Sequence, residues 1–205
     1  MSPPRTFLTT AALGLATMAT TALAACNGED ALCDRLYSNV TFVGSHDSAF
    51  VGELLADNQL VSVADQLALG VRFLQGQTHN KDGTIEMCHT SCLELDAGSL
   101  ADYLAPVKTF MDANPDEVLT LLLTNGDDIA VADYAAVFSS VGLDEYVFTP
   151  SGTLALDGWP TLQTMIDNGT RLVVWMGMSW SSRVFALVGQ AGTTSVSRRG
   201  SRLKP

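Results

Sequence analysis

Two histidines follow short segments that have the composition of buried strands. His46 comes soon after the apolar run 40–43, and His89 ends the strand-like segment 84–89. Barrel enzymes place their catalytic residues at the carboxyl ends of strands. One neutral imidazole can take the proton of a hydroxyl group beside a phosphodiester, and a protonated imidazole can give its proton to the leaving oxygen. A lone histidine is more often structural, but the pair predicts acid/base cleavage of a phosphodiester.

The third histidine and the cysteines offer a second interpretation of the same region. His79 lies in a polar stretch, where we expect a solvated loop residue. Together with Cys88, His89 and Cys92 it could also ligate zinc. Their spacing fits no zinc pattern closely, and cysteines four positions apart in a secreted chain are more often oxidised or structural. We therefore expect no metal site and no cofactor.

Strand-like and helix-like segments alternate along the chain around these residues. Strands are expected to begin near residues 40, 71, 118 and 171, and helices at about 61–69, 99–113, 130–141 and 161–167. The strand 118–123 is apolar on both faces, which is typical of a parallel sheet covered by helices. The acidic pair Asp127-Asp128 is expected in a loop or at a helix start, where a carboxylate favours the helix dipole.

Four such strands with the hairpin return at 84–89 amount to half of an eight-stranded barrel. The expected fold class is therefore α/β, a (β/α) TIM-type barrel present as its N-terminal half over residues 26–177. A small doubly wound α/β domain is the structural alternative. No Gly-rich phosphate loop follows any of the strands, which disfavours that alternative.

The first 25 residues have the pattern of a secretory signal peptide. Arg5 precedes an uncharged stretch, 7–25, that ends in small residues suited to cleavage. We therefore expect a secreted, extracellular protein with no transmembrane anchor after signal cleavage. Asn39 and Asn168 stand in glycosylation sequons, which agrees with secretion.

All four cysteines follow the predicted signal peptide, at positions 26, 33, 88 and 92. In an oxidising compartment two disulfides are expected. Four cysteines allow three pairings, and the local pairing of Cys26 with Cys33 and of Cys88 with Cys92 matches the two clusters in which they fall.

Charge is distributed unevenly along the chain, whose formal net charge is −11. Residues 1–177 hold all 22 acidic residues and six of the 11 basic ones, whereas residues 178–205 hold five basic residues and no acidic one. An acidic domain argues against nucleic acid as a partner and against long-range attraction to anionic bilayers. We expect residues 178–205 to be a basic tail that forms no native part of the barrel, although a natural basic tail is an alternative.

Several motifs in order resemble the secreted fungal branch of the phosphatidylinositol-specific phospholipase C X-domain superfamily. The resemblance covers about residues 26 to 176. The specific feature is that both histidine motifs occur in order and are separated by a Gly-Val-Arg strand. The motifs are Cys26-Asn27-Gly28, Leu32-Cys33-Asp34-Arg35, Ser38-Asn39-Val40-Thr41, Gly44-Ser45-His46-Asp47-Ser48-Ala49-Phe50, Gly70-Val71-Arg72-Phe73-Leu74 and Cys88-His89-Thr90-Ser91-Cys92.

The resemblance implies a phosphodiesterase or lyase with His46 as general base, His89 as general acid and Asp47 as a local supporting group. Bacterial members carry a phosphate-neutralising arginine at the end of the second strand, and metal-dependent animal members carry carboxylates for calcium. Here Gln75 and Gln77 occupy those positions, and their amides could bind substrate by donating hydrogen bonds to phosphate. Arg72 is one register away, so its side chain is expected on the opposite face.

Three functions remain in competition. The first is a metal-independent hydrolase or lyase for a phospholipid or another small phosphodiester, acting as a monomer. The second is a non-catalytic secreted binding protein that keeps the barrel pocket, which the uncharged glutamines favour. The third, a metal-dependent glycerophosphodiesterase, is disfavoured because the acidic ligands are absent. Since only half of the barrel strands are expected, we also expect this chain to be inactive by itself.

Overall fold

The computed structural model describes residues 25–178 and 181–186. The predicted signal peptide, except Ala25, and most of the predicted tail lie outside these residues. The strands are β1 Gly44–Ser45, β2 Phe73–Lys81, β3 Thr84–Cys88, β4 Asp96–Ser99, β5 Leu119–Asn125, β6 Leu172–Met178 and β7 Ser181–Ala186. The α-helices are α1 Val63–Ala68, α2 Leu100–Ala113, α3 Val131–Ser140 and α4 Leu162–Asp167. Short 3-10 helices are η1 Cys26–Gly28, η2 Asp30–Leu32, η3 Tyr37–Asn39, η4 Asp144–Tyr146 and η5 Leu156–Gly158.

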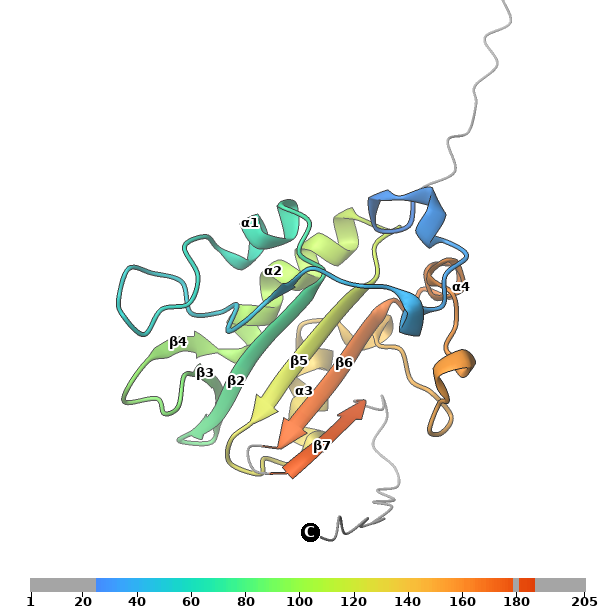
Figure 1. Ribbon diagram of the computed structural model, residues 1–205. Coiled ribbons are helices and arrows are strands. Elements are labelled where there is room, and N and C mark those ends of the chain that lie inside the picture. The colour runs from blue at the N-terminus through green and yellow to red at the C-terminus, as the bar shows by residue number, and fades with distance from the viewer. Residues whose placement is uncertain (1–24, 179–180, 187–205) are drawn as a thin grey trace, which may run out of the picture.

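The strands of the described residues form one sheet in the order β4-β3-β2-β5-β6-β7, with β1 paired to β2 (Figure 1). The pairs β1–β2, β2–β5 and β5–β6 are parallel, as expected for the four predicted core strands. β3 is the antiparallel return of a hairpin from β2. The sheet is not closed within the described residues, so the structure shows a mixed α/β fold with the parallel strands of the predicted TIM-type barrel, but not a barrel.

Three strands differ from those that the sequence predicts. The first strand is expected at 40–43, but it forms at Gly44–Ser45, because the side chains of Val40 and Phe42 pack into an aromatic cluster instead. β4 has no apolar alternation, and it is held by its pairing with β3 and by a 2.6 Å hydrogen bond from Lys81 of β2 to Asp96. β7 lies within the predicted tail and pairs antiparallel with β6, so a basic composition did not exclude a strand there.

Three of the four α-helices in the described residues have a serine or threonine as their N-cap. The side-chain oxygens of Ser62, Ser99 and Thr161 accept hydrogen bonds from backbone N–H groups in the first turns of α1, α2 and α4. Such caps satisfy donors that the first turn of a helix leaves free. They fix where each helix starts relative to the strand before it, within two residues of the predicted starts.

The main core lies between the sheet and the helices α1, α2 and α3, which Figure 1 shows behind the strands. Alternate residues of β5, namely Leu119, Leu121 and Leu123, are fully buried against these helices. The residues between them face the other side of the sheet, where Thr120 is also fully buried. Burial on both faces explains why this strand has no polar alternation.

The opposite face of the sheet is covered at its N-terminal end by an aromatic cluster. Tyr37 stacks on Trp159 with ring centroids 4.8 Å apart, and Trp159 in turn contacts Trp175 of β6 at 5.7 Å. The Tyr37 hydroxyl shares a 2.7 Å hydrogen bond with Thr120 Oγ1. Burial raises the pKa of Tyr37 despite that bond.

Both disulfides form within the two predicted clusters. Cys26 is bonded to Cys33, and Cys88 to Cys92, which confirms the local pairing. Within the described residues, no helix has both the length and the apolar character needed to cross a membrane.

Candidate active site

The candidate site lies where two strands meet the same edge of β2. β1 pairs with the beginning of β2, at Phe73 and Leu74, whereas β3 pairs with its end, from Thr78 to Lys81. Between them, residues 75–77 of β2 have no strand partner on this edge. The chain leaves β1 at His46 and leaves β3 at His89, so both histidines emerge beside this short gap.

The two imidazoles converge on one carboxylate oxygen. His46 Nε2 lies 3.1 Å from Asp47 Oδ2, and His89 Nε2 lies 3.3 Å from the same atom. The Asp47 side chain is completely buried, whereas the His46 and His89 side chains are 70% and 26% exposed. The predicted residues His46, Asp47 and His89 are therefore brought together, although Asp47 contacts both histidines rather than His46 alone.

Asp47 is held by the backbone and by β2. Its φ of 48° lies in the left-handed region, which residues with a Cβ rarely adopt. The Gln75 side-chain oxygen accepts a 2.8 Å hydrogen bond from the Asp47 N–H. The next residue, Ser48, donates both its N–H and its hydroxyl to the Gln75 carbonyl. These bonds fix the turn that aims the carboxylate at the two rings.

A buried tyrosine supports this turn from the helix side. Tyr103 of α2 shares a 2.7 Å hydrogen bond with Ser48 Oγ, and burial raises the pKa of its hydroxyl. Gln66 of α1 donates to the Ser48 carbonyl at 3.0 Å. Neither residue was predicted from the sequence, because each occupies an ordinary helix position and nothing in its spacing distinguishes it.

The His89 loop is closed by a disulfide and by short hydrogen bonds. The Cys88–Cys92 bridge brackets His89, whose N–H donates to the Leu95 carbonyl at 3.0 Å. The ring meets Phe50 edge-on, with centroids 5.5 Å apart. Thr90 follows in the left-handed region at a φ of 63°, and the Gln77 side-chain oxygen accepts its N–H at 3.1 Å.

Gln75 and Gln77 lie on the same face of β2, at the gap between β1 and β3. Their oxygens are engaged by the backbone of the two histidine loops. An open pocket of about 300 Å³, lined by Gly44, Ser45, His46, Phe73 and Gln75, lies beside them. A role for both glutamines in binding substrate stays a prediction.

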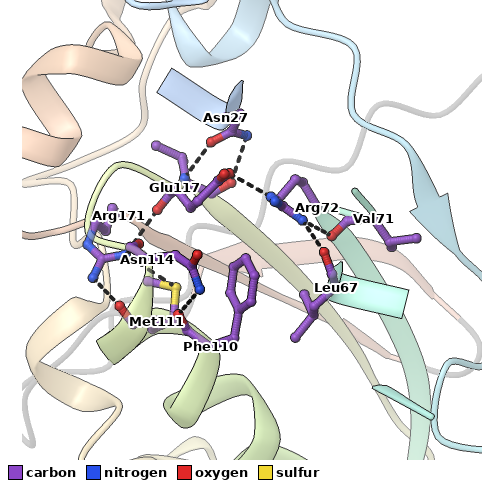
Figure 2. A network of polar contacts seen from close by, with 10 residues as sticks. Asn27, Leu67, Val71, Arg72, Phe110, Met111, Asn114, Glu117 and Arg171 are labelled. Atoms are coloured by element: carbon purple, nitrogen blue, oxygen red, sulfur yellow. Dashed lines mark hydrogen bonds and ion pairs between the residues drawn. The ribbon is translucent and has the colours of Figure 1, made fainter. Parts of the chain in front are cut away.

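Arg72 points away from this site, as expected from its register. Its Nε donates to Glu117 at 2.6 Å, its guanidinium lies 4.7 Å from the centre of the Phe110 ring, and a further nitrogen donates to the Leu67 carbonyl (Figure 2). These contacts place the arginine on the helix side of the sheet. Its guanidinium is therefore not available at the gap beside the two histidines.

His79 does not behave as the solvated loop residue that the sequence predicts. It belongs to β2, its side chain is only 18% exposed, and Nδ1 lies 3.0 Å from Asp127 Oδ1. Asp127 also accepts the Asn80 N–H at 2.7 Å, which lowers the pKa of its carboxyl. Asp127 lies in the loop between β5 and α3, one of the two expected placements, and there its carboxylate pairs with the end of β2.

The zinc interpretation does not fit the described residues. Cys88 and Cys92 are joined in a disulfide, so their sulfurs are not thiolates, and His79 is paired with Asp127. Among the described residues, no group of three or more histidine, cysteine, aspartate or glutamate side chains is placed to hold a metal ion.

Comparison with known proteins points to one family. The sequence matches the family described as PI-PLC X 1 over residues 32–188. The PI-PLC X domain-containing protein 1 of Arthroderma benhamiae is 50% identical over 183 residues, which cover 86% of this chain and 60% of that protein. An uncharacterized secreted protein of the same organism is 44% identical over 153 residues, which cover 74% of this chain and 35% of that protein.

Solved structures show the same fold at low identity. A mutant of phosphatidylinositol-specific phospholipase C from Staphylococcus aureus matches with a TM-score of 0.54 and 19% identity, over 71% of this chain and 50% of that one. The Listeria monocytogenes enzyme matches with a TM-score of 0.53 and 19% identity, over 71% and 54%. The chain thus spans less than two thirds of the length of each of these relatives.

Proposed function

Because the chain belongs to the PI-PLC X domain family, we propose that it cleaves the head-group phosphodiester of a phospholipid, with His46 and His89 as base and acid. Half of a barrel was expected to be inactive by itself, but His46, Asp47 and His89 all lie together within this half, so we propose that the chain is active. One observation supports this most strongly. The Nε2 atoms of both histidines lie within 3.3 Å of the same buried oxygen of Asp47. A structural histidine pair would not require a shared, buried carboxylate next to an open pocket.

We assign the proton transfers from the positions of the ring nitrogens. In the tautomer of neutral His46 that carries its proton on Nε2, which lies 3.1 Å from Asp47 Oδ2, the Nδ1 atom has a lone pair for the hydroxyl beside the phosphodiester. The hydroxyl proton passes to His46 while its oxygen bonds to phosphorus. The bond from phosphorus to the leaving oxygen breaks, and protonated His89 supplies the proton that this oxygen needs. A cyclic phosphate and a free alcohol result.

Asp47 has the same task before and after this step. The histidine pair holds one extra proton throughout, on His89 at the start and on His46 at the end. A buried carboxylate is costly unless a cation compensates it. Because Oδ2 lies 3.1 Å from one Nε2 and 3.3 Å from the other, the carboxylate stabilises the imidazolium on either ring. The reaction therefore does not have to separate charge inside the site.

Exposed leucines beside the site favour a lipid substrate. The segment between β1 and α1 contains three of them, Leu54, Leu55 and Leu60, which are 69%, 108% and 85% exposed. This segment is joined to the site, because Gln59 donates to the His46 carbonyl at 2.6 Å. Leu93, in the segment after His89, is 101% exposed. Because the chain has a formal net charge of −11, these exposed leucines suit contact with a zwitterionic rather than an anionic bilayer.

We also propose that the protein is secreted and glycosylated. A relative at 44% identity is described as a secreted protein, and both disulfides fit an oxidising compartment. Asn39 and Asn168 are exposed, so both sequons are accessible. Removal of N-linked glycans from protein secreted by a eukaryotic host should lower its mass, and the loss should disappear in a variant lacking both asparagines. An unchanged mass would contradict this.

The function is tested with the purified full chain on phosphatidylcholine vesicles that contain phosphatidylinositol, because inositol carries a hydroxyl beside the phosphodiester and choline does not. Release is expected from phosphatidylinositol alone. His46→Ala and His89→Ala should each lower release of the head group about 100-fold or more. His79→Ala is the matched control, since it removes an aspartate-paired histidine outside the site and should leave turnover unchanged. Activity should also persist in EDTA.

Three outcomes would count against the proposal. Full activity in either site variant would remove the histidine mechanism, and loss of activity in EDTA would indicate a metal. No turnover by the parent chain, together with saturable binding of inositol phosphate, would favour the non-catalytic binding protein instead.

A further inference from the structure

We infer that Gln75 and Gln77 are paired positioning residues that lock the two histidine loops, an inference that rests on the proposed function. Gln75 Oε1 accepts the N–H of Asp47, and Gln77 Oε1 accepts the N–H of Thr90, at 2.8 and 3.1 Å. In each case the bonded residue directly follows a histidine in the sequence. One strand therefore holds both loops in the same way.

Both bonded residues have a backbone conformation that needs such support. The φ angles of Asp47 and Thr90 are 48° and 63°. Side chains disfavour this left-handed region, and the β-branched threonine disfavours it most. Each glutamine oxygen accepts a donor whose orientation this conformation fixes, so each bond selects the turn that aims the preceding histidine. Without the bond, the loop would be free to relax towards ordinary extended or helical backbone.

Side chains, rather than backbone pairing, hold the two histidine loops because the β2 edge has a gap beside them. Residues 75–77 have no strand on that side, because β1 ends at Ser45 and β3 reaches only as far as Cys88. Gln75 and Gln77 point to one face, two positions apart, as alternate strand residues do. Their side chains therefore reach the two loops where backbone pairing has stopped.

The residue type matters, because only an acceptor can make this contact. An arginine has five N–H donors and no acceptor, so it could not hold either loop. The accepting oxygen also fixes each amide, because the opposite orientation would set NH₂ against a backbone N–H. Within the described residues, neither Nε2 atom has a protein partner. It remains available to a ligand, whereas the oxygen does not.

The test compares methionine and glutamate at each position in the full, ¹⁵N-labelled chain. Gln75→Met and Gln77→Met keep the length of the side chain but remove the acceptor. Gln75→Glu and Gln77→Glu keep an acceptor oxygen but remove the amide donors. Exchange of the Asp47 amide proton should become at least tenfold faster only in Gln75→Met, and that of Thr90 only in Gln77→Met.

Each position is thus the control for the other, and Gln163→Met on α4 controls for the substitution itself. Glutamate should restore slow exchange in both cases. If a methionine variant fails to fold, Gln75→Asn or Gln77→Asn shortens the same side chain by one methylene and should give the same exchange pattern. Unchanged exchange of Asp47 and Thr90 in folded variants would overturn the inference.

Turnover separates this role from substrate binding. A positioning role predicts that the methionine variants lose kcat with little change in KM, and that glutamate recovers part of kcat. If the amides act only by donating to phosphate, glutamate should instead be worse than methionine and KM should rise, which would overturn the positioning role. An inactive parent chain with the predicted exchange pattern would refute the proposed function but leave the loop-locking role intact.

Discussion

Replacement of Arg171 by methionine should cost much of the stability of the fold. Arg171 is 5% exposed as a residue. Its guanidinium donates to three carbonyls near the end of α2, those of Met111, Asn114 and Glu117, at 2.6, 2.9 and 3.1 Å (Figure 2). It also lies 4.7 Å from the centre of the Tyr146 ring. The positive charge sits where the helix dipole is negative. Methionine fills a similar volume but leaves all three acceptors without this donor.

The magnitude follows from these contacts and from the cost of burying the charge. A hydrogen bond to a charged group contributes about 1.5–3 kcal/mol, so the three bonds together give about 4.5–9 kcal/mol before desolvation is counted. Burial lowers the pKa of Arg171, which shows that desolvation opposes the charge. Leaving a buried acceptor unsatisfied costs about 1–3 kcal/mol, so for three carbonyls, after the desolvation of the charge is deducted, we expect a net loss of about 3–5 kcal/mol.

Urea unfolding followed by tryptophan fluorescence and circular dichroism measures this loss. Arg35→Met is the matched control, because Arg35 is exposed and its substitution should change the free energy of unfolding by less than about 0.5 kcal/mol. Arg171→Lys keeps the charge without the planar fork and should fall between them. A loss below about 1 kcal/mol in Arg171→Met, or a gain, would show that desolvation cancels the hydrogen bonds and would refute the reasoning.

Three further outcomes are expected. Asp127→Asn should lower stability at neutral pH, because the Asn80 N–H lowers the pKa of the Asp127 carboxyl in the folded state. This contribution to stability is present above the unfolded pKa and is lost as pH falls through the folded pKa. The urea unfolding curves of the two proteins should therefore converge below about pH 4. Cys88→Ser should cost about 2 kcal/mol by denaturant titration, as expected for a short closed loop, and should shift the NMR signals of His89. Leu55→Ser should weaken binding to phosphatidylcholine vesicles severalfold in a sedimentation assay while the melting temperature stays unchanged, since the side chain is fully exposed.

The sequence predicted the features that depend on local patterns. The apolar run of β5 predicted a strand buried on both faces, and the spacing of the cysteines predicted both disulfides. β4 could not be found this way, because pairing with β3 makes that short polar segment extended.

The candidate site was predictable in composition but not in geometry. The prediction placed both histidines at strand ends. However, β3 runs antiparallel to β1 and β2, so the carboxyl ends of β1 and β3 point in opposite directions along the sheet. The two ends meet only because both strands share the β2 edge. Sharing of Asp47 by both rings, and the capture of the glutamine oxygens by backbone, depend on turns at φ values that no pattern in the sequence specifies.

The shared edge of β2 also bears on how the protein reaches its folded state. Every contact among the two histidines, Asp47 and the two glutamines lies between residues 46 and 90, and needs no residue from β5 or β6. Asp47 is 28 positions from Gln75 and Thr90 is 13 positions from Gln77, and the entropy cost of closing such loops grows only slowly with their length. The proposed proton-transfer pair is thus carried by one contiguous stretch, which could be transplanted, together with its support from Tyr103 and Leu95, into another sheet whose edge carries a similar gap.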